Sequence, residues 1–161
     1  MNMKSNNLIS EFLLLNSIAV VGVSRNGKEP ANHIFEKFQN EGYQVFAVNP
    51  NATQISGEKV FHDVLSIPEN VEGVVIATHP DVTKSIIEQC AAKGVKYVWI
   101  HKSFGEGSYC EEAVKYAHLR HINVIESGCP LMYLNPDLVH TCMKWVLNKF
   151  NKTHEEETVT A

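Results

Sequence analysis

The chain lacks the cysteine spacing that marks zinc sites and dithiol redox centres. Its four cysteines stand well apart in 161 residues, and no two form a C-x-x-C pair. They are Cys90, Cys110, Cys129 and Cys142. A chain of this length buries enough apolar surface to fold without disulfides, so we expect a protein of a reducing compartment, the cytoplasm.

Long apolar runs are missing as well. The apolar stretch at residues 12–23 is broken by Asn16 and Ser17. A membrane-spanning helix needs about 20 consecutive apolar residues. Before Glu11 the only charge is that of Lys4, which does not suit a signal peptide. We therefore expect no membrane partner.

An excess of basic charge is also absent. Lys and Arg number 14 and Asp and Glu number 18, with three of the acidic residues in the stretch 155–157. The rest of the chain is close to neutral, whereas binding to duplex nucleic acid depends on a dense footprint of Lys and Arg. Nucleic acid is therefore not an expected partner.

The composition is typical of one globular domain. Apolar residues make up 44% of the chain and charged residues 20%. No internal repeat or interdomain linker is evident. We predict a single domain over residues 9–150 and a disordered polar tail over residues 151–161.

Short apolar runs rich in β-branched residues recur along the chain, each with the length of a buried strand. Five are strong, at residues 18–23, 45–48, 74–77, 97–100 and 122–125. A weaker run at residues 59–61 makes a possible sixth strand.

Segments with helical spacing alternate with these runs. They cover residues 30–42, 81–93, 108–120 and a stretch from residue 135 onward. Pro30 suits a first helical position, and Gly42 and Gly94 suit left-handed caps. Ser108 and Glu111 match a capping box, in which a hydroxyl and a carboxylate bind the unpaired amides of a first turn.

Strands separated by helices of this length predict parallel pairing through right-handed crossovers. We expect an α/β fold with a doubly wound parallel sheet of five to six strands, in the order 3-2-1-4-5-6 along the chain. In such a sheet the ligand lies beyond the carboxyl ends of the strands, beside the first strand. Functional residues are therefore sought in the loops that follow the strands.

Two nucleotide-binding motifs are incomplete in the loop after the first strand. Gly22, Gly27 and Lys28 fit the spacing G-x-x-x-x-G-K, but Glu29 stands where a phosphate-binding loop needs the hydroxyl that binds Mg²⁺. The dinucleotide fingerprint G-x-G-x-x-G is also incomplete, because Val23 and Ser24 follow Gly22. Neither motif is favoured.

Asn49 and Pro50 stand at the end of the second strand, where NAD-binding proteins tend to place an acidic residue. A carboxylate about 4 Å from a ribose phosphate would oppose it by about 4 kcal/mol at an effective dielectric constant near 20. Asn49 avoids this repulsion. The pocket is therefore expected to accept a phosphorylated adenosine.

Ser24 and Arg25 support a third interpretation of the first loop. A hydroxyl, backbone amides and a guanidinium suit phosphate oxygens, and Lys28 can add a second positive charge. The structural alternative is an ordinary turn in which Ser24 caps the following helix and Arg25 is solvated.

An ordered set of segments extends this interpretation. It comprises Val20-Val-Gly-Val-Ser-Arg25, Pro30-Ala31, Gly42-Tyr43, Val48-Asn-Pro50, Gly57 with the Phe61 region, Ile67-Pro68, Val71-Glu-Gly-Val-Val-Ile76, Gly94-Val-Lys-Tyr-Val-Trp99 and Gly128-Cys-Pro130. Across about residues 18–134 the chain resembles the CoA-binding domain family, Rossmann-like proteins related to the nucleotide domain of acyl-CoA synthetases and of the succinyl-CoA ligase alpha subunit.

The resemblance implies that coenzyme A binds beside the first strand, with Gly22, Val23, Ser24 and Arg25 near the phosphates. It places Asn49 and Pro50 near the adenosine end. The family often follows its Trp with Gln and a nearby Gly, whereas His101, Lys102 and Ser103 stand here. Contacts from that loop are not carried over from the family.

Three further residues follow a central strand at the same edge. Thr78, His79 and Pro80 are predicted to contact the ligand, but His79 has no nucleophile or carboxylate evidently paired with it for catalysis. Cys129 is the cysteine best placed to meet the thiol of coenzyme A, although a buried loop residue is the favoured interpretation. The spacing of His118 and His121 does not favour a metal site.

The leading hypothesis is a stand-alone protein that binds coenzyme A or an acyl-CoA without catalysis of its own. The alternative is an NAD(P)-dependent oxidoreductase or redox-sensing module, with NADP as the alternative cofactor because Arg25 can bind its extra phosphate. A regulatory module with a vestigial pocket is a third possibility. Self-association and a partner enzyme that uses acyl-CoA both stay open.

Overall fold

The computed structural model describes residues 3–102, 107–126 and 128–135. Its centre is a seven-stranded sheet in the order β3-β4-β2-β1-β5-β6-β7. The strands are β1 (Ser17–Val21), β2 (Gln44–Val48), β3 (Gln54–Ile55), β4 (Glu58–Phe61), β5 (Gly73–Ile76), β6 (Tyr97–Ile100) and β7 (Asn123–Ile125). The helices are α1 (Met3–Leu13), α2 (Pro30–Asn40), α3 (Pro80–Lys93), α4 (Glu111–Leu119) and the short 3₁₀ helix η1 (Pro130–Met132).

The predicted topology is confirmed. The six predicted strands pair in parallel in the expected order, with β1 between β2 and β5. The winding therefore reverses beside β1, and the carboxyl ends of β1, β2, β4 and β5 meet at one edge. The prediction of five to six strands missed only β3, a two-residue strand that pairs antiparallel with β4 at the border of the sheet.

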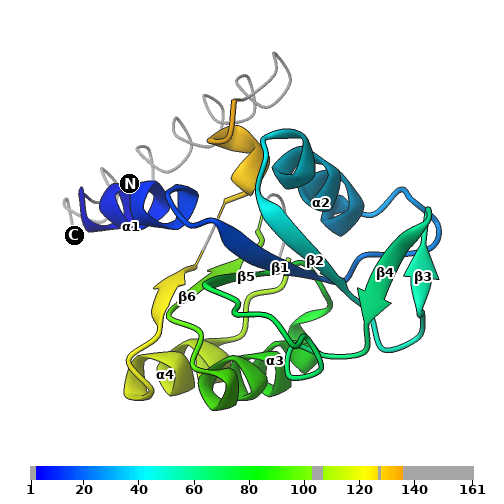
Figure 1. Ribbon diagram of the computed structural model, residues 1–161. Helices are drawn as coiled ribbons and strands as arrows, with labels where there is room; N and C mark the ends of the chain where they lie inside the picture. Colours follow the sequence, from blue (N-terminus) through cyan, green and yellow to red (C-terminus); the bar gives the residue numbers. More distant parts are fainter. Residues whose placement is uncertain (1–2, 103–106, 127, 136–161) are drawn as a thin grey trace.

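Helices cover both faces of the sheet, so the fold has three layers (Figure 1). Successive side chains of β1 point to opposite faces of the sheet, so this strand packs against both helical layers. Ala19 and Val21 pack in the cluster with α3 and α4, whereas Ile18 and Val20 pack with α1, α2 and η1. All five residues of β1 are buried, as its continuous apolar run predicted.

Helix α1 was not foreseen, yet it completes the second layer. Phe12 is fully buried, and its ring packs edge to face against those of Trp99 and Phe38, with ring centres 5.4 Å and 6.4 Å apart. Gly73 of β5 makes room for it, because a Cβ there would lie 2.9 Å from the Phe12 ring. Ring pairs of this kind add about 0.5–1.5 kcal/mol to the burial of their area.

The helix boundaries follow the expected signals in three cases. Pro30 occupies the first turn of α2, Gly42 follows that helix in the left-handed conformation with φ of +87°, and Gly94 ends α3 in the same conformation with φ of +84°. The prediction of a capping box at α4 is wrong. Cys110 occupies the N-cap position, and no side chain caps this end of the helix. Ser108 instead bonds to another loop, as described below.

Several predictions fall on residues outside the described ranges. The predicted last helix, from residue 135 onward, falls almost wholly there, as do Cys142 and the predicted tail 151–161. The domain limits 9–150 therefore stay a prediction. Within the described residues, no helix is long and apolar enough to cross a bilayer.

Candidate functional site

Asn49 connects the loops that follow β1 and β2. Its side-chain amide donates to the carbonyl oxygen of Val23 at 2.7 Å, and its Oδ1 accepts from the amide of Asn51 at 2.8 Å. The backbone of Asn49 also donates to the carbonyl of Phe61, at the end of β4. This residue therefore fixes the relative positions of three strand ends.

Asn32 holds the first loop from the other side. Its Oδ1 accepts from the amide of Ser24 at 3.0 Å, and its Nδ2 donates to the carbonyl of Ser24 at 2.7 Å. Ser24 does not cap α2: its hydroxyl accepts from the amide of Asn26, and the cap position belongs to Glu29. The loop that carries Arg25 is thus held at its base by two asparagine side chains.

Gly22 permits a close approach between the loops after β1 and β5. It has φ of +109°, and a Cβ at this position would lie 2.3 Å from the carbonyl oxygen of Ala77. Any side chain would force the two loops apart. The glycine is therefore required for packing at the edge, whatever its distance from a ligand.

A cavity of about 600 Å³ lies where these loops meet the end of β4. Its lining comes from the β1–α2 loop, from the segment between β2 and β3 with the first residue of β3, and from β4 with the turn after it. The lining residues are Arg25, Pro50, Asn51, Ala52, Thr53, Gln54, Lys59, Val60, Phe61, His62 and Ser66. This volume is in the range of small-molecule and cofactor sites.

The lining combines apolar surface with basic side chains. Pro50, Val60 and Phe61 supply apolar atoms, and the Lys59 ammonium lies 4.6 Å from the centre of the Phe61 ring. Arg25 and Lys59 carry positive charge, and the lining contains no Asp or Glu. Such a site suits a ligand with a flat apolar part and an anionic group.

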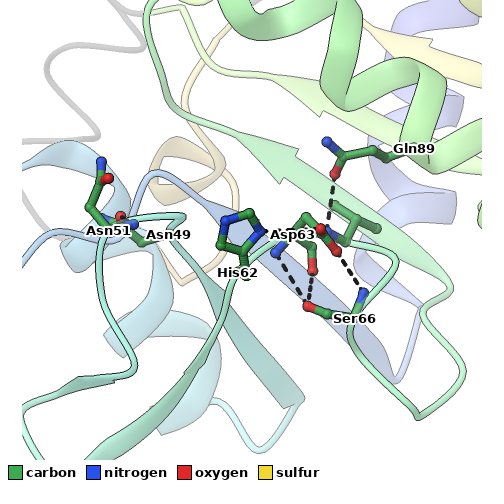
Figure 2. Close-up of polar contacts among 7 residues, drawn as sticks. Asn49, Asn51, His62, Asp63, Ser66 and Gln89 are labelled. Atoms are coloured by element: carbon green, nitrogen blue, oxygen red, sulfur yellow. Dashed lines mark hydrogen bonds and ion pairs between the residues drawn. The ribbon is translucent and has the colours of Figure 1, made fainter.

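His62 lines the cavity. It lies between the loop of Asn49 and Asn51 and the turn of Asp63 and Ser66 (Figure 2). Its Nδ1 lies 3.2 Å from Oδ2 of Asp63, whose other carboxylate oxygen accepts from the amide of Ser66 at 2.7 Å. The hydrogen bonds from His62 and Ser66 lower the pKa of Asp63. The amide of Val64 in turn donates to Gln89 of α3 at 3.1 Å, which anchors this turn to the body of the protein.

Ser108 joins the loops after β5 and β6. Its hydroxyl donates to the carbonyl of Thr78 at 2.7 Å and accepts from the amide of Thr78 at 2.9 Å. The hydroxyl of Thr83 donates to the carbonyl of Ser108 at 2.7 Å. Both side chains are buried, so this network holds the backbone of Thr78 in place.

His79 is largely exposed at the first turn of α3, where its Nδ1 lies 3.1 Å from Oδ2 of Asp81. Thr78, His79 and Pro80 all stand at the predicted edge, but they do not line the cavity. Lys28 does not line it either. Cys129 is buried at the start of η1, in agreement with the favoured interpretation.

The structure thus brings two predicted site residues, Arg25 and Pro50, into one cavity. It uses Gly22, Val23 and Asn49 to shape the loops that surround them. Lys59 and His62 were missed, although Lys59 begins the weak apolar run at residues 59–61 and His62 follows it, and the carboxyl end of that run had to lie beside that of β2. Asn32 was missed too, and its signal was a polar residue on the buried face of α2.

No metal centre is evident among the residues the structure describes, since they hold no group of three or more His, Cys, Asp or Glu arranged for an ion. His118 faces Glu126, with Nε2 and Oε1 3.6 Å apart. His101, at the end of β6, is buried, and burial lowers its pKa.

Curated relatives of the chain are ligases that use coenzyme A. The alpha subunit of ADP-forming acetate-CoA ligase II from Pyrococcus furiosus is 30% identical over 129 residues, which are 76% of this chain and 28% of that subunit. An ADP-forming acetate-CoA ligase II from Archaeoglobus fulgidus is 33% identical over 82 residues, 50% of this chain and 12% of that protein. The chain therefore spans a minor part of these relatives.

A solved structure matches most of the chain. A hypothetical protein from Pyrococcus horikoshii aligns with a TM-score of 0.74 and 26% identity, covering 83% of this chain and 96% of that one. The family model described as "CoA binding domain" matches residues 16–135, which hold the entire sheet and the cavity. The chain belongs to the CoA-binding domain family, as its sequence segments indicated.

Proposed function

We propose that this protein binds coenzyme A or an acyl-CoA at the carboxyl edge of the sheet, with the adenosine end in the cavity beside Arg25 and Pro50. Family membership and the cavity support this assignment together. The observation that carries it is a cavity with basic and apolar lining at the carboxyl ends of β2 and β4, bordered by the loop after β1, the strand beside which the winding of the sheet reverses.

The chemistry of the adenosine end fits the lining. A purine ring needs apolar and aromatic contact, which Pro50 and Phe61 offer, and phosphate oxygens need cationic or N–H donors, which Arg25 and Lys59 offer. Asn49 contributes no charge that would repel a phosphate. It is engaged in structural hydrogen bonds instead.

The residues predicted near the rest of the ligand lie along the same edge. Gly22, Val23 and Ser24 follow β1, while Thr78 and His79 follow β5, the next strand in the sheet. In this proposal the diphosphate and the pantetheine arm pass over these loops, away from β4. The role is binding, and the ligase activity named for the longer relatives belongs to those whole proteins.

Thermal unfolding with coenzyme A, acetyl-CoA, NAD, NADP and ATP in parallel tests this proposal. A ligand at about a hundred times its Kd adds about 2.7 kcal/mol to the stability of the folded state, which raises Tm by several degrees. We expect coenzyme A and acetyl-CoA to raise Tm most. A selective response to NADP would contradict the proposal and favour the oxidoreductase alternative.

Arg25→Ala locates the site in the same assay, with Arg120→Ala as its matched control. Arg120 lies at the end of α4, and its side chain contacts Tyr116. We expect the first variant to reduce the shift caused by coenzyme A and the second to leave it unchanged. Equal shifts in a folded Arg25→Ala protein would remove this residue from the site.

A further inference from the structure

Lys102 stands at the carboxyl edge of the sheet, two residues after the end of β6. The residue is half-buried, and its ammonium lies 5.1 Å from the centre of the Tyr109 ring. An aromatic face attracts a cation but does not neutralise its charge. The ring therefore holds the ammonium in place and leaves its charge for an anion.

Lysines on the two adjacent helices differ from Lys102, because each has its own carboxylate. On α3 the ammonium of Lys84 lies 3.0 Å from Oε2 of Glu112. On α4 the ammonium of Lys115 lies 2.6 Å from Oε1 of Glu111. In the part of the chain that the structure describes, no carboxylate lies within 4.0 Å of the Lys102 ammonium. A half-buried lysine without a counterion at a ligand-binding edge indicates that the ligand supplies the anion.

The backbone on both sides of this lysine is fixed. The amide of Lys102 donates to the carbonyl of Gly128 at 3.1 Å, which joins the loops after β6 and β7. The amide of Ser108 donates to the carbonyl of His101 at 2.9 Å, directly before Lys102. Lys102 and Tyr109 are therefore held side by side at the edge of the sheet.

A series of contacts connects Lys102 to the loop after β5, over which the proposed function places the pantetheine arm. The hydroxyl of Ser108 bonds to the amide and the carbonyl of Thr78, at 2.9 and 2.7 Å. Tyr109 follows Ser108 in the chain, and its ring faces the Lys102 ammonium. The ammonium therefore lies one loop further along the edge than Thr78.

The length of the ligand agrees with this position. Strands β1, β5 and β6 are adjacent in the sheet, so the loop after β6 lies two strand spacings, about 10 Å, from the loop after β1. The pantetheine arm, from its phosphate oxygen to its sulfur, has about as many chain atoms as four extended residues, which span about 14 Å. With the diphosphate at the loop after β1, the sulfur reaches the loop after β6, and a short acyl group on it can contact Lys102.

We propose that Lys102 binds a carboxylate at the free end of the acyl group, so that the protein prefers CoA thioesters of dicarboxylic acids to those of simple fatty acids. This inference rests on the proposed function and adds the class of acyl group to it. A terminal carboxylate forms a charge-assisted hydrogen bond with the ammonium. A methyl group in the same place leaves the ammonium without an anion.

Titration calorimetry with pairs of thioesters that differ only in the terminal group tests this subsite. The pairs are malonyl-CoA with propionyl-CoA and glutaryl-CoA with pentanoyl-CoA, in which a carboxylate replaces a methyl group on a chain of equal length. We expect wild-type protein to bind the carboxylate member about tenfold more tightly or better in one pair or both, the equivalent of about 1.4 kcal/mol. Equal affinities within both pairs would overturn the subsite.

Lys102→Gln should abolish the preference by weakening the binding of the carboxylate member alone. Its affinities for propionyl-CoA and for free coenzyme A should stay those of wild type. Lys102→Arg keeps a cation beside Tyr109 and should retain most of the preference. Lys96→Gln removes an exposed lysine at the opposite edge of the sheet, and this matched control should retain all of it. The Tm of each unliganded variant establishes that it is folded.

The diphosphate of coenzyme A is the other source of an anion for Lys102. An equal loss of affinity for every ligand in folded Lys102→Gln, free coenzyme A included, would assign Lys102 to the diphosphate and contradict the acyl subsite. An unchanged preference in this variant would contradict it as well. The outcomes also separate the two proposals. Failure of coenzyme A and of every thioester to bind would refute the proposed function, whereas binding of all of them without preference for a carboxylate would refute only the subsite.

Discussion

The side-chain amide of Asn49 donates a 2.7 Å hydrogen bond to the carbonyl oxygen of Val23, and so ties the end of β2 to the end of β1. The sequence pointed to Asn49 because an acidic residue at this position would repel a phosphate. The structure adds a second reason for an amide here, because a carboxylate could not donate the hydrogen bond to Val23. Stability and the charge of the site therefore depend on the same amide.

Asn49→Asp should lower the free energy of unfolding by about 1–3 kcal/mol, because a part-buried carbonyl loses its donor and faces a negative charge. Urea denaturation at neutral pH measures the change. Asn123→Asp, at an exposed position at the start of β7, is the control and should change stability little. Equal stability of Asn49→Asp and wild type would mean that the Val23 bond contributes nothing.

Gly22→Ala should destabilise the protein by about 2–4 kcal/mol, because the added Cβ would clash with the carbonyl of Ala77 and φ is positive. Gly27→Ala separates the two effects. Gly27 has φ of +67° with open space around it, so Gly27→Ala should lower the free energy of unfolding by only about 1–2 kcal/mol. Equal losses of stability in the two variants would show that the close approach of the loops is unimportant.

Ser108→Ala should cost about 1–3 kcal/mol, since the amide and carbonyl of Thr78 would both lose their side-chain partner in a buried place. Ser85→Ala is the matched control: Ser85 lies on the exposed side of α3, and its hydroxyl donates to the carbonyl of Val82 in its own helix. Thermal unfolding of both variants tests this. A smaller loss at Ser108 than at Ser85 would contradict the role of the network.

The buried imidazole of His101 should make the protein less stable in mild acid. Burial lowers its pKa below 6.5, so the unfolded chain takes up the proton first as the pH falls, and stability decreases below about pH 6.5. One proton accounts for at most about 1.4 kcal/mol per pH unit.

Urea denaturation of wild type and His101→Gln between about pH 7.5 and 5 measures this contribution. The wild-type curve should fall more steeply, because Gln does not titrate and the other histidines are common to both proteins. Parallel curves would show that His101 does not carry this dependence.

The sheet was predictable because its signals are local. The β-branched run of β1, buried along its whole length, predicts a central strand, and Gly94 marks the end of α3. Helix α1 was missed because its buried face, including Phe12, precedes a second apolar run that obscures its periodicity. The capping box failed because Ser108 found two backbone partners at Thr78, thirty residues away in the sequence, which no local pattern reveals.

The site was predictable only in part. Arg25 and Pro50 follow strong strands, so their loops could be placed at the correct edge. The placement of Lys59 and His62 in the site requires β4, which has only a weak strand signal in the sequence. In the structure β4 lies beside β2, with Val48 paired to Phe61. The contact between His62 and Asp63 depends on the turn closed by Ser66, and side-chain geometry of this kind is set by the fold.

An amide-resolved NMR titration of the protein with coenzyme A tests the central claim most directly. The account predicts saturable shifts in the loops after β1, β2 and β4, including Arg25, Asn51 and His62, with little change at the opposite edge around Asn16 and Glu72. Shifts confined to that opposite edge, or none at saturating coenzyme A, would contradict binding at the carboxyl edge of the sheet.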